Sequence, residues 1–138
     1  MSSAPVSTPP PSPSGDLLAA ASSRSPLLAI LRGFSPDETV RLCEVAWAAG
    51  ARLVEVPIQD PSAHDSLAAA VEAGLTRGRV VGAGTVTTLD RLETAERLGA
   101  RFTVAPGFDP EVALASREAG LPHLPGVATA TEVQRAMA

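Results

Sequence analysis

Apolar and polar positions recur in one order from residue 26 onward: a short aliphatic run, a turn, and a longer amphipathic stretch that ends near glycine. The aliphatic runs lack clean alternation, which is typical of strands buried on both faces of a parallel sheet. The expected strands cover residues 27–33, 52–58, 79–86, 101–107 and 121–127. The expected helices cover about residues 36–49, 62–74, 89–98, 110–119 and 129–138. The pattern predicts an α/β domain of about five βα units.

Local signals mark the ends of these helices. Ser35–Glu38 and Thr129–Glu132 read as capping boxes, in which a hydroxyl and an acid three residues later satisfy free N–H groups of the first turn. Asp109 followed by Pro110 is a further helix start, because proline fits the first helical position. Glycine stands where a left-handed C-cap is expected, at Gly50, Gly74, Gly99 and Gly120.

The chain also contains an internal echo. "AAGARLVEVP" (48–57) and "RLGARFTVAPG" (97–107) share Gly-Ala-Arg followed by a strand that ends near proline, which favours tandem βα units. A complete eight-unit barrel takes about 250 residues, whereas this chain has 138. We therefore expect residues 26–138 to form an incomplete (βα)8 TIM-barrel-type domain, with about five of its units.

Composition narrows the possible partners. Residues 1–25 are rich in Pro and Ser at their start and are expected to form a disordered tail. A net charge of −4, three Phe, one Trp and no Tyr argue against a nucleic-acid partner. No stretch approaches the roughly 20 apolar residues of a membrane span, and none reads as a signal peptide. Cys43, the single cysteine, lies in an apolar helical run and is expected to be buried. A soluble cytoplasmic protein is expected.

A carboxylate stands in the middle of the second expected strand. Glu55 lies between Val54 and Val56, whose side of the strand, shared with Ile58, is expected to pack against helices. On the other side, Glu55 must be paired, solvated or kept for chemistry. Ligands gather at the carboxyl ends of strands in α/β folds. Polar residues and turns at those ends add Arg32, Gln59, Thr85 and the segment "APG" (105–107), a set that suits a small anionic substrate.

Plainer interpretations remain for three of these residues. Arg32 could form a strand-end ion pair, Thr85 could be a satisfied strand hydroxyl, and Gln59 could be a solvated loop residue. "GAGT" (82–85) lacks both the third glycine of a dinucleotide fingerprint and the Gly-Lys-Ser/Thr of a P-loop, so its glycines are expected to leave room for a ligand. His64 and His123 have no partner at metal-ligand spacing, and no metal is expected.

Five segments together carry a family resemblance. The segments are "LLAILRGFSPDETV", "GARLVEVPIQDP", "VVGAGTV", "APGFDPEV" and "PGVATATE". In this order and spacing, residues 27–138 resemble the 2-keto-3-deoxy-6-phosphogluconate/galactonate aldolase family. The resemblance implies a (βα)8 barrel, usually a homotrimer, that needs no cofactor. It also implies reversible cleavage of a 2-keto-3-deoxy-6-phospho sugar acid into pyruvate and glyceraldehyde 3-phosphate through a lysine Schiff base.

The resemblance assigns roles to the candidate residues. Glu55 matches the catalytic, proton-shuttling carboxylate, and Arg32 and Thr85 match positions that contact the keto acid part of the substrate. Pro106 matches a position that lines the site. Gln59 stands where the gluconate enzymes have Arg and galactonate-type relatives have a neutral amide, which favours the galactonate branch. A shielded carboxylate with a raised pKa can accept and donate a proton near neutral pH.

The chain contains no lysine. By resemblance, the Schiff-base lysine belongs to a sixth strand that these 138 residues do not reach, and an imine needs an amine nucleophile. The chain alone is therefore expected to be an inactive, truncated aldolase. An alternative is a non-catalytic half-barrel that pairs its open edges with another chain. A metal-dependent barrel lyase is a third, weaker option. An open inner face is expected to cause self-association, since another wall would have to cover its apolar residues, among them Leu53, Val81, Phe102 and Val104.

Overall fold

The computed structural model describes residues 18–19 and 25–138. The expected tail, residues 1–25, lies almost wholly outside the described residues, so the boundary near residue 26 stays a prediction. Within the described part of the chain, no helix has both the length and the apolar character needed to cross a membrane.

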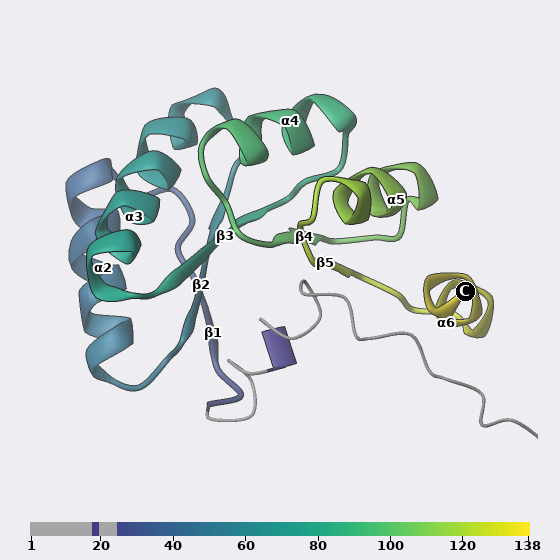
Figure 1. The fold of residues 1–138 in the computed structure, drawn as a ribbon, viewed down its shortest axis with the longest axis horizontal. Helices are drawn as coiled ribbons and strands as arrows, with labels where there is room; N and C mark the ends of the chain where they lie inside the picture. Colours follow the sequence, from purple (N-terminus) through teal and green to yellow (C-terminus); the bar gives the residue numbers. More distant parts are fainter. Residues whose placement is uncertain (1–17, 20–24) are drawn as a thin grey trace, which may run out of the picture.

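Five strands form a single parallel sheet in the order β1-β2-β3-β4-β5. The strands are β1 (Leu28–Ile30), β2 (Leu53–Pro57), β3 (Val80–Gly84), β4 (Thr103–Ala105) and β5 (His123–Pro125). The helices are α2 (Pro36–Ala48), α3 (His64–Arg77, entered through the 3-10 turn η1, Pro61–Ala63), α4 (Leu89–Arg97), α5 (Pro110–Glu118) and α6 (Ala130–Met137). In Figure 1, helices α2 to α5 line one side of the curved sheet and α6 lies apart from them. The prediction of an incomplete α/β barrel with five βα units is confirmed.

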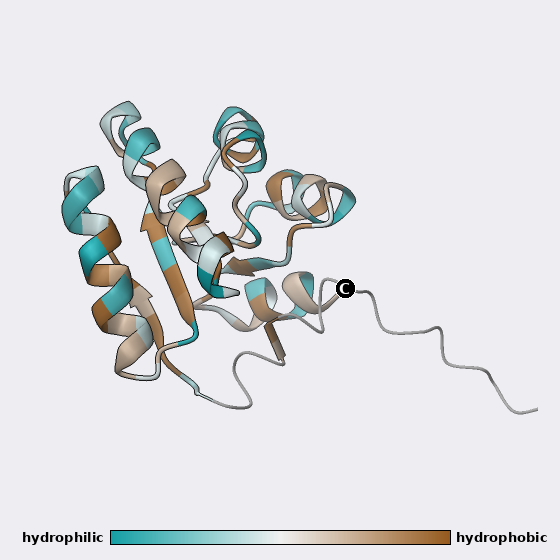
Figure 2. Cartoon of the chain, turned by 60° about the vertical axis from the view of Figure 1, so that its left-hand side comes forward, coloured by the Kyte–Doolittle hydropathy of each residue, from teal (hydrophilic) through white to brown (hydrophobic). Residues whose placement is uncertain are grey.

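The core lies between the sheet and these helices. Val54, Val56 and Ile58 are each no more than 1% exposed, and they pack in one apolar cluster with residues of α2 and α3. That confirms the expected packing side of β2. The residues that α2 and α3 contribute are Cys43, Trp47, Leu67 and Ala70. Figure 2 shows largely hydrophobic strands and mixed helices, as a sheet covered by amphipathic helices requires.

Most of the predicted helix ends are confirmed. Both capping boxes are formed, and the Asp109 side chain accepts hydrogen bonds from the first turn of α5. Gly50, Gly99 and Gly120 have positive φ just after their helices. The expected C-cap at Gly74 is wrong, because α3 continues to Arg77 and ends on Gly78 at φ 61°. Gly74 instead gives α3 room beside the next strand, since a Cβ there would lie 2.9 Å from the carbonyl oxygen of Arg79.

The expectation of an exposed apolar inner face is wrong at three of its four named positions, which are Val81, Leu53 and Phe102. Val54 stands opposite Val81, so Val81 lies on the helix-covered side, in the core, and not on the inner face. The prediction assigned Val81 to the wrong face because successive residues of a strand point to opposite faces of the sheet, so an error of one residue reverses the assignment. Leu53 and Phe102 are buried at 4% and 0% exposure. The exposed apolar side chains of the inner face lie on the edge strands: Ile30 at 58%, opposite Glu55, and Leu124 at 38%, opposite Val104.

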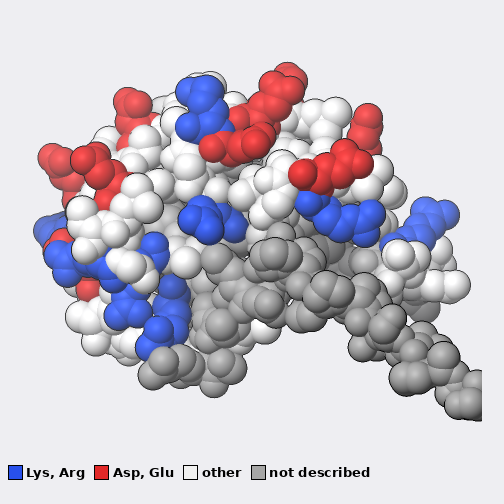
Figure 3. All heavy atoms as spheres, viewed as in Figure 1, with Lys and Arg blue, Asp and Glu red and all other residues white. Residues whose placement is uncertain are grey.

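The charged surface is mixed on the face seen in Figure 3. Carboxylates gather along its upper rim, and arginines lie at its left and between the carboxylates. Among the described residues, one ion pair is formed, between Arg77 Nη2 of α3 and Glu44 Oε1 of α2 at 2.5 Å. Acidic and basic side chains therefore both contribute to this face.

Candidate active site

All five candidate residues lie on β1 to β4 or just beyond the carboxyl ends of these strands. Arg32, Gln59, Thr85 and Pro106 follow β1, β2, β3 and β4 in turn, and Glu55 lies within β2. Because the strands are parallel and adjacent in chain order, these residues share one edge of the sheet. Arg32, Gln59 and Pro106 are exposed, Thr85 is half-buried, and Glu55 is 3% exposed.

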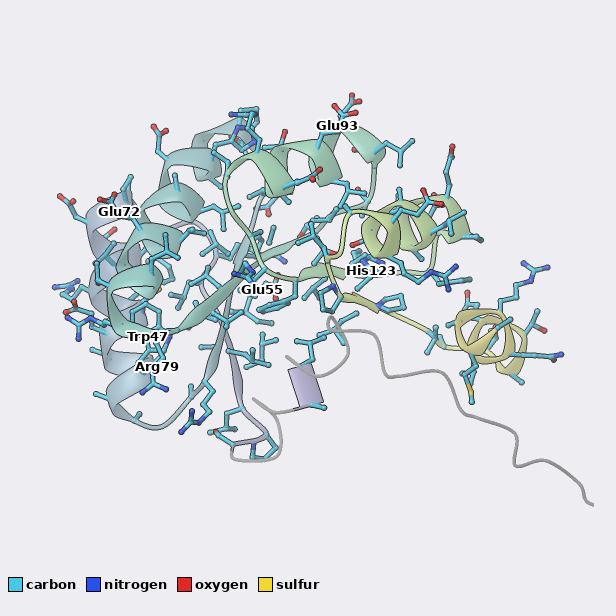
Figure 4. The ribbon with its side chains drawn as sticks, in the orientation of Figure 1. Trp47, Glu55, Glu72, Arg79, Glu93 and His123 are labelled. Atoms are coloured by element: carbon cyan, nitrogen blue, oxygen red, sulfur yellow. The ribbon has the colours of Figure 1, made fainter. Side chains whose placement is uncertain are left out.

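Glu55 is the one buried acid among the described residues. Its side chain forms no hydrogen bond or ion pair with any other described side chain or backbone group. Burial raises the pKa of the Glu55 carboxyl above its ordinary value of 4.5, and the nearby charge of Arg32 partly offsets that rise. Figure 4 shows Glu55 at the middle of the sheet, away from the helical surface. A raised pKa makes a carboxyl a weaker acid than usual, so it keeps its proton to a higher pH.

Two glycines of β3 make room for side chains of the protein itself. Gly84 stands opposite Pro57, and a Cβ on Gly84 would overlap Oε1 of Glu55. A Cβ on Gly82 would overlap the ring of Phe102. The expectation that these glycines leave space for a ligand is therefore wrong. Gly84 instead determines where the Glu55 carboxyl can lie.

Thr85 is the extra residue of a β-bulge. Ala83 N–H donates to Phe102 O at 3.0 Å, and Val86 N–H donates to Val104 O at 3.0 Å. The advance of three residues from Ala83 to Val86, at the end of β3, thus matches an advance of only two residues from Phe102 to Val104, at β4. One extra residue in one of two paired segments is the mark of a β-bulge. Thr85 has φ 57° and is the one non-glycine residue with positive φ in the described ranges. A β-branched residue in this region is strained, and such strain clusters at functional sites.

The plainer interpretations of Thr85 and Arg32 are not supported. Thr85 lies outside the strand, and its hydroxyl makes no hydrogen bond to the described residues. Arg32 forms no ion pair with the described carboxylates. Gln59 is exposed, as a solvated loop residue would be, but its backbone carbonyl is bound by a helix residue, Arg91, which the sequence did not suggest. The available signal was an arginine in the first turn of α4, a position where a cation opposes the helix dipole.

Pro106 is held by the neighbouring loop. Gly126 N–H donates to Ala105 O at 2.9 Å, and a Cβ on Gly126 would overlap the carbonyl oxygen of Pro106. A cavity of about 270 Å³ opens beside Pro106, and its lining does not include Glu55. The cavity lining comprises Val86, Thr87, Ala105, Pro106, Gly107, Phe108, Asp109, Val112 and His123.

His123 contacts neighbouring hydroxyl groups, and Cys43 is buried. His123 Nδ1 and Thr103 Oγ1 are 2.8 Å apart, and Thr103 Oγ1 lies 2.8 Å from the Ser116 hydroxyl, which donates to Leu121 O. Burial lowers the pKa of His123. The Cys43 thiol is buried, and burial raises its pKa to about 11, so it is not a thiolate at neutral pH. No group of three His, Cys, Asp or Glu that could hold a metal occurs within the described ranges.

Fold and site together define an α/β chain of the TIM-barrel type with its polar residues at the carboxyl edge of the sheet. A family model, "Aldolase: KDPG and KHG aldolase", matches residues 19–138. The chain belongs to this aldolase family.

Known proteins similar to this chain are also named as aldolases. The chain is 36% identical to the 2-dehydro-3-deoxy-6-phosphogalactonate aldolase of Escherichia coli over 81% of its own length and 54% of the relative's. It is 35% identical to the 2-dehydro-3-deoxy-phosphogluconate aldolase of Treponema pallidum, over 73% of this chain and 47% of the relative. A solved Legionella pneumophila KDPG aldolase "with pyruvate captured at low pH as a covalent carbinolamine intermediate" matches with a TM-score of 0.76 and 27% identity, over 86% of this chain and 56% of that one. The chain spans about half the length of the curated relatives it matches.

Proposed function

We propose that this chain supplies five βα units of an aldolase barrel that cleaves a 2-keto-3-deoxy-6-phospho sugar acid, of the galactonate or gluconate type, to pyruvate and glyceraldehyde 3-phosphate. The observation that carries the proposal is the buried Glu55 carboxyl, with its raised pKa, beside Gly84 in a member of the KDPG and KHG aldolase family. The galactonate and gluconate relatives match almost equally well, so the proposal covers both substrates.

Glu55 is proposed to transfer the protons of an imine mechanism. Water loses a proton when it attacks the imine carbon, which was the ketone carbon of the substrate, and the enamine carbon gains or loses one. A single carboxyl near its pKa can serve both steps, because it is present in both protonation states. Arg32 would oppose the negative charge of the keto acid, and Gln59 and Thr85 would contact the substrate from the adjoining loops. Pro106 would line the site from the end of β4.

No lysine of these 138 residues can supply the amine of the imine. The Legionella relative holds pyruvate as a covalent carbinolamine, and forming one takes an amine nucleophile. This chain has no lysine. We therefore expect no pyruvate release by the chain alone and no borohydride-reduced pyruvate adduct on any side chain of residues 26–138.

A chimera tests the function. Residues 26–138 would be joined to the remaining half of the Escherichia coli relative, and pyruvate release from both phospho sugar acids would be measured. We expect activity, with Glu55→Gln lowering turnover by about 10²–10⁴-fold, the usual contribution of general acid–base catalysis. Glu44→Gln, an exposed acid on α2, is the matched control. A folded chimera that is inactive, or one that Glu55→Gln leaves active, would contradict the proposal.

A second candidate is a non-catalytic half-barrel that pairs with another chain. Two observations favour it: the chain has no lysine, and Ile30 and Leu124 are exposed on the edge strands. The family resemblance further suggests a homotrimer in the cytoplasm. An inactive but folded chimera that binds neither pyruvate nor the phospho sugar acids would favour this second candidate.

A further inference from the structure

One guanidinium, that of Arg91, spans the ends of two strands. Arg91 lies in the first turn of α4, where its backbone N–H donates to the side chain of the N-cap Thr88. Its Nη2 donates to the carbonyl oxygen of Gln59 at 3.0 Å. Its Nη1 donates to Thr87 Oγ1 at 2.6 Å and, at 3.4 Å, to the carbonyl oxygen of Thr85. The side chain therefore touches the loop after β2 and the bulge after β3 at once.

Among the described residues, no other polar side chain connects the loop after β2 with the bulge after β3. The last ladder bond between the two strands runs from Ile58 N–H to Gly84 O at 2.9 Å. Past that bond, the chain at Gln59 and the chain at Thr85 separate, and the hydrogen bonds between these two loops all pass through Arg91. A helix dipole disfavours a cation at this end of α4. Helix stability therefore does not explain the arginine, but the bridge does.

The bridge also satisfies the strained residue. The left-handed φ of Thr85 turns its peptide out of the regular ladder, so its carbonyl needs a donor elsewhere. Arg91 supplies that donor, while Val86 N–H is held by Val104 O on the other side. The bulge is thus fixed from α4 and from β4.

We propose that Arg91 is a positioning residue that locks the Gln59 loop and the Thr85 bulge into one rigid unit. The proposal rests on the proposed function, because Gln59 and Thr85 are the residues expected to contact substrate. Only a planar fork of donors reaches both carbonyls, so lysine cannot replace arginine here.

Amide hydrogen exchange in the 138-residue chain tests the bridge directly. In Arg91→Gln, we expect the amides of Ile58 and Val86 to exchange about tenfold faster, the loss expected for a hydrogen bond to a charged group. The amide of Ala83, which lies deeper in the sheet, should keep its rate. Arg91→Lys should resemble Arg91→Gln. Arg97→Gln, in the last turn of the same helix, is the matched control and should change neither amide.

A second variant covers the case in which Arg91→Gln fails to fold. Thr87→Val keeps the β-branched shape and removes one of the three contacts. It should speed exchange at Val86 more than at Ile58, because the link to Gln59 survives. Equal amide exchange rates at Ile58 and Val86 in Thr87→Val, Arg91→Gln and Arg97→Gln would overturn the proposal.

A binding measurement separates this inference from the function it rests on. Pyruvate would be titrated into the chimera described above and into its Arg91→Gln and Arg97→Gln variants, with chemical shifts read at residues 55–59 and 84–87. We expect Arg91→Gln to weaken binding about tenfold while the Arg97→Gln control keeps wild-type affinity. If the unsubstituted chimera does not bind pyruvate but exchange at Ile58 and Val86 in the 138-residue chain still rises in Arg91→Gln, the bridge stands and the proposed function fails. If pyruvate binds equally well to Arg91→Gln, the positioning role fails.

Discussion

At the scale of single residues, the site depends on one pair across neighbouring strands. Glu55 occupies the space that any side chain on Gly84 would need, and it is buried with no described hydrogen-bond partner. An ionised carboxylate buried without a partner lowers the stability of the fold, whereas the protonated carboxyl costs less to bury. The pair therefore links the stability of the fold to pH.

The Glu55 carboxyl should make the fold less stable as pH rises. Its folded pKa lies above the ordinary value of 4.5, so between 4.5 and the folded pKa the folded state holds a proton that the unfolded state has lost. The free energy of unfolding therefore falls across that window and stays lower above it. Urea unfolding of wild type and Glu55→Gln from pH 4 to 8 checks this.

Glu55→Gln should abolish that dependence and gain stability relative to wild type toward pH 8. The control is Glu38→Gln, in which the acid has its pKa lowered by hydrogen bonds from Ser35. An acid of that kind has the opposite sign: its contribution is present above 4.5 and is lost as the pH falls below it. Parallel pH curves for wild type and Glu55→Gln would mean that Glu55 is solvated.

Gly84→Ala should displace the Glu55 carboxyl. The new Cβ overlaps Oε1, and overpacking of this kind costs about 1–3 kcal/mol of unfolding free energy. The carboxyl should also titrate nearer its ordinary pKa in an NMR titration, because it is pushed toward solvent. Gly107→Ala is the control, since a Cβ at Gly107 meets nothing within 4 Å. Equal stability in the two variants would show that Glu55 moves aside without cost.

The sequence predicted one member of this pair and not the other. Glu55 stood out because an acid in an aliphatic strand has few structural explanations. Glycine is needed at position 84 because the strand register sets it opposite Pro57, beside the Glu55 side chain. The sequence of a single strand carries no information about that register. The same limit placed Val81 on the wrong face and left Arg91 unnoticed.

At the scale of elements, the bulge at Thr85 is the irregular feature that shapes the site. Helix starts and three of the four expected glycine ends were predictable, because each depends on residues within one turn. The bulge was not, because it exists only relative to β4. Left-handed positions normally take glycine, so threonine there indicates that its side chain is retained at a cost in stability.

Thr85→Gly should therefore raise the free energy of unfolding by about 1 kcal/mol, since glycine adopts the left-handed conformation without strain. Thr85→Ala is the matched control, because it removes the hydroxyl but keeps the Cβ that causes the strain. Chemical denaturation should rank glycine above alanine, the reverse of their usual order inside a strand. Alanine above glycine would show that Thr85 is not strained.

At the scale of the whole molecule, the sheet has two open edges. Among the described residues, β1 and β5 each pair on one side only, and Ile30 and Leu124 expose apolar surface there. Exposed strand edges with apolar neighbours promote pairing between chains. The number of βα units was predictable from the recurring pattern of apolar runs and amphipathic stretches, whereas the amount of inner face that stays exposed required coordinates.

Light scattering should show species heavier than the 14.0 kDa monomer. The double variant Ile30→Thr/Leu124→Thr replaces both exposed apolar side chains with threonine, which is favourable in strands. Because it removes apolar surface at the two edges, it should shift the population toward monomer. Leu75→Gln, at 72% exposure on α3, is the control for association through the helices. A monodisperse wild-type monomer would contradict association through the edges.

The strand order has a consequence for how the chain folds. Each βα unit pairs only with the unit before it and the unit after it in the sequence, as repeats do in a solenoid. A unit can therefore dock as soon as its predecessor is in place, so folding can proceed vectorially while the ribosome is still adding residues. Among the described residues, α6 is a helix without a buried residue. Slowly exchanging amides should accordingly concentrate in β2 and β3, with α6 exchanging first.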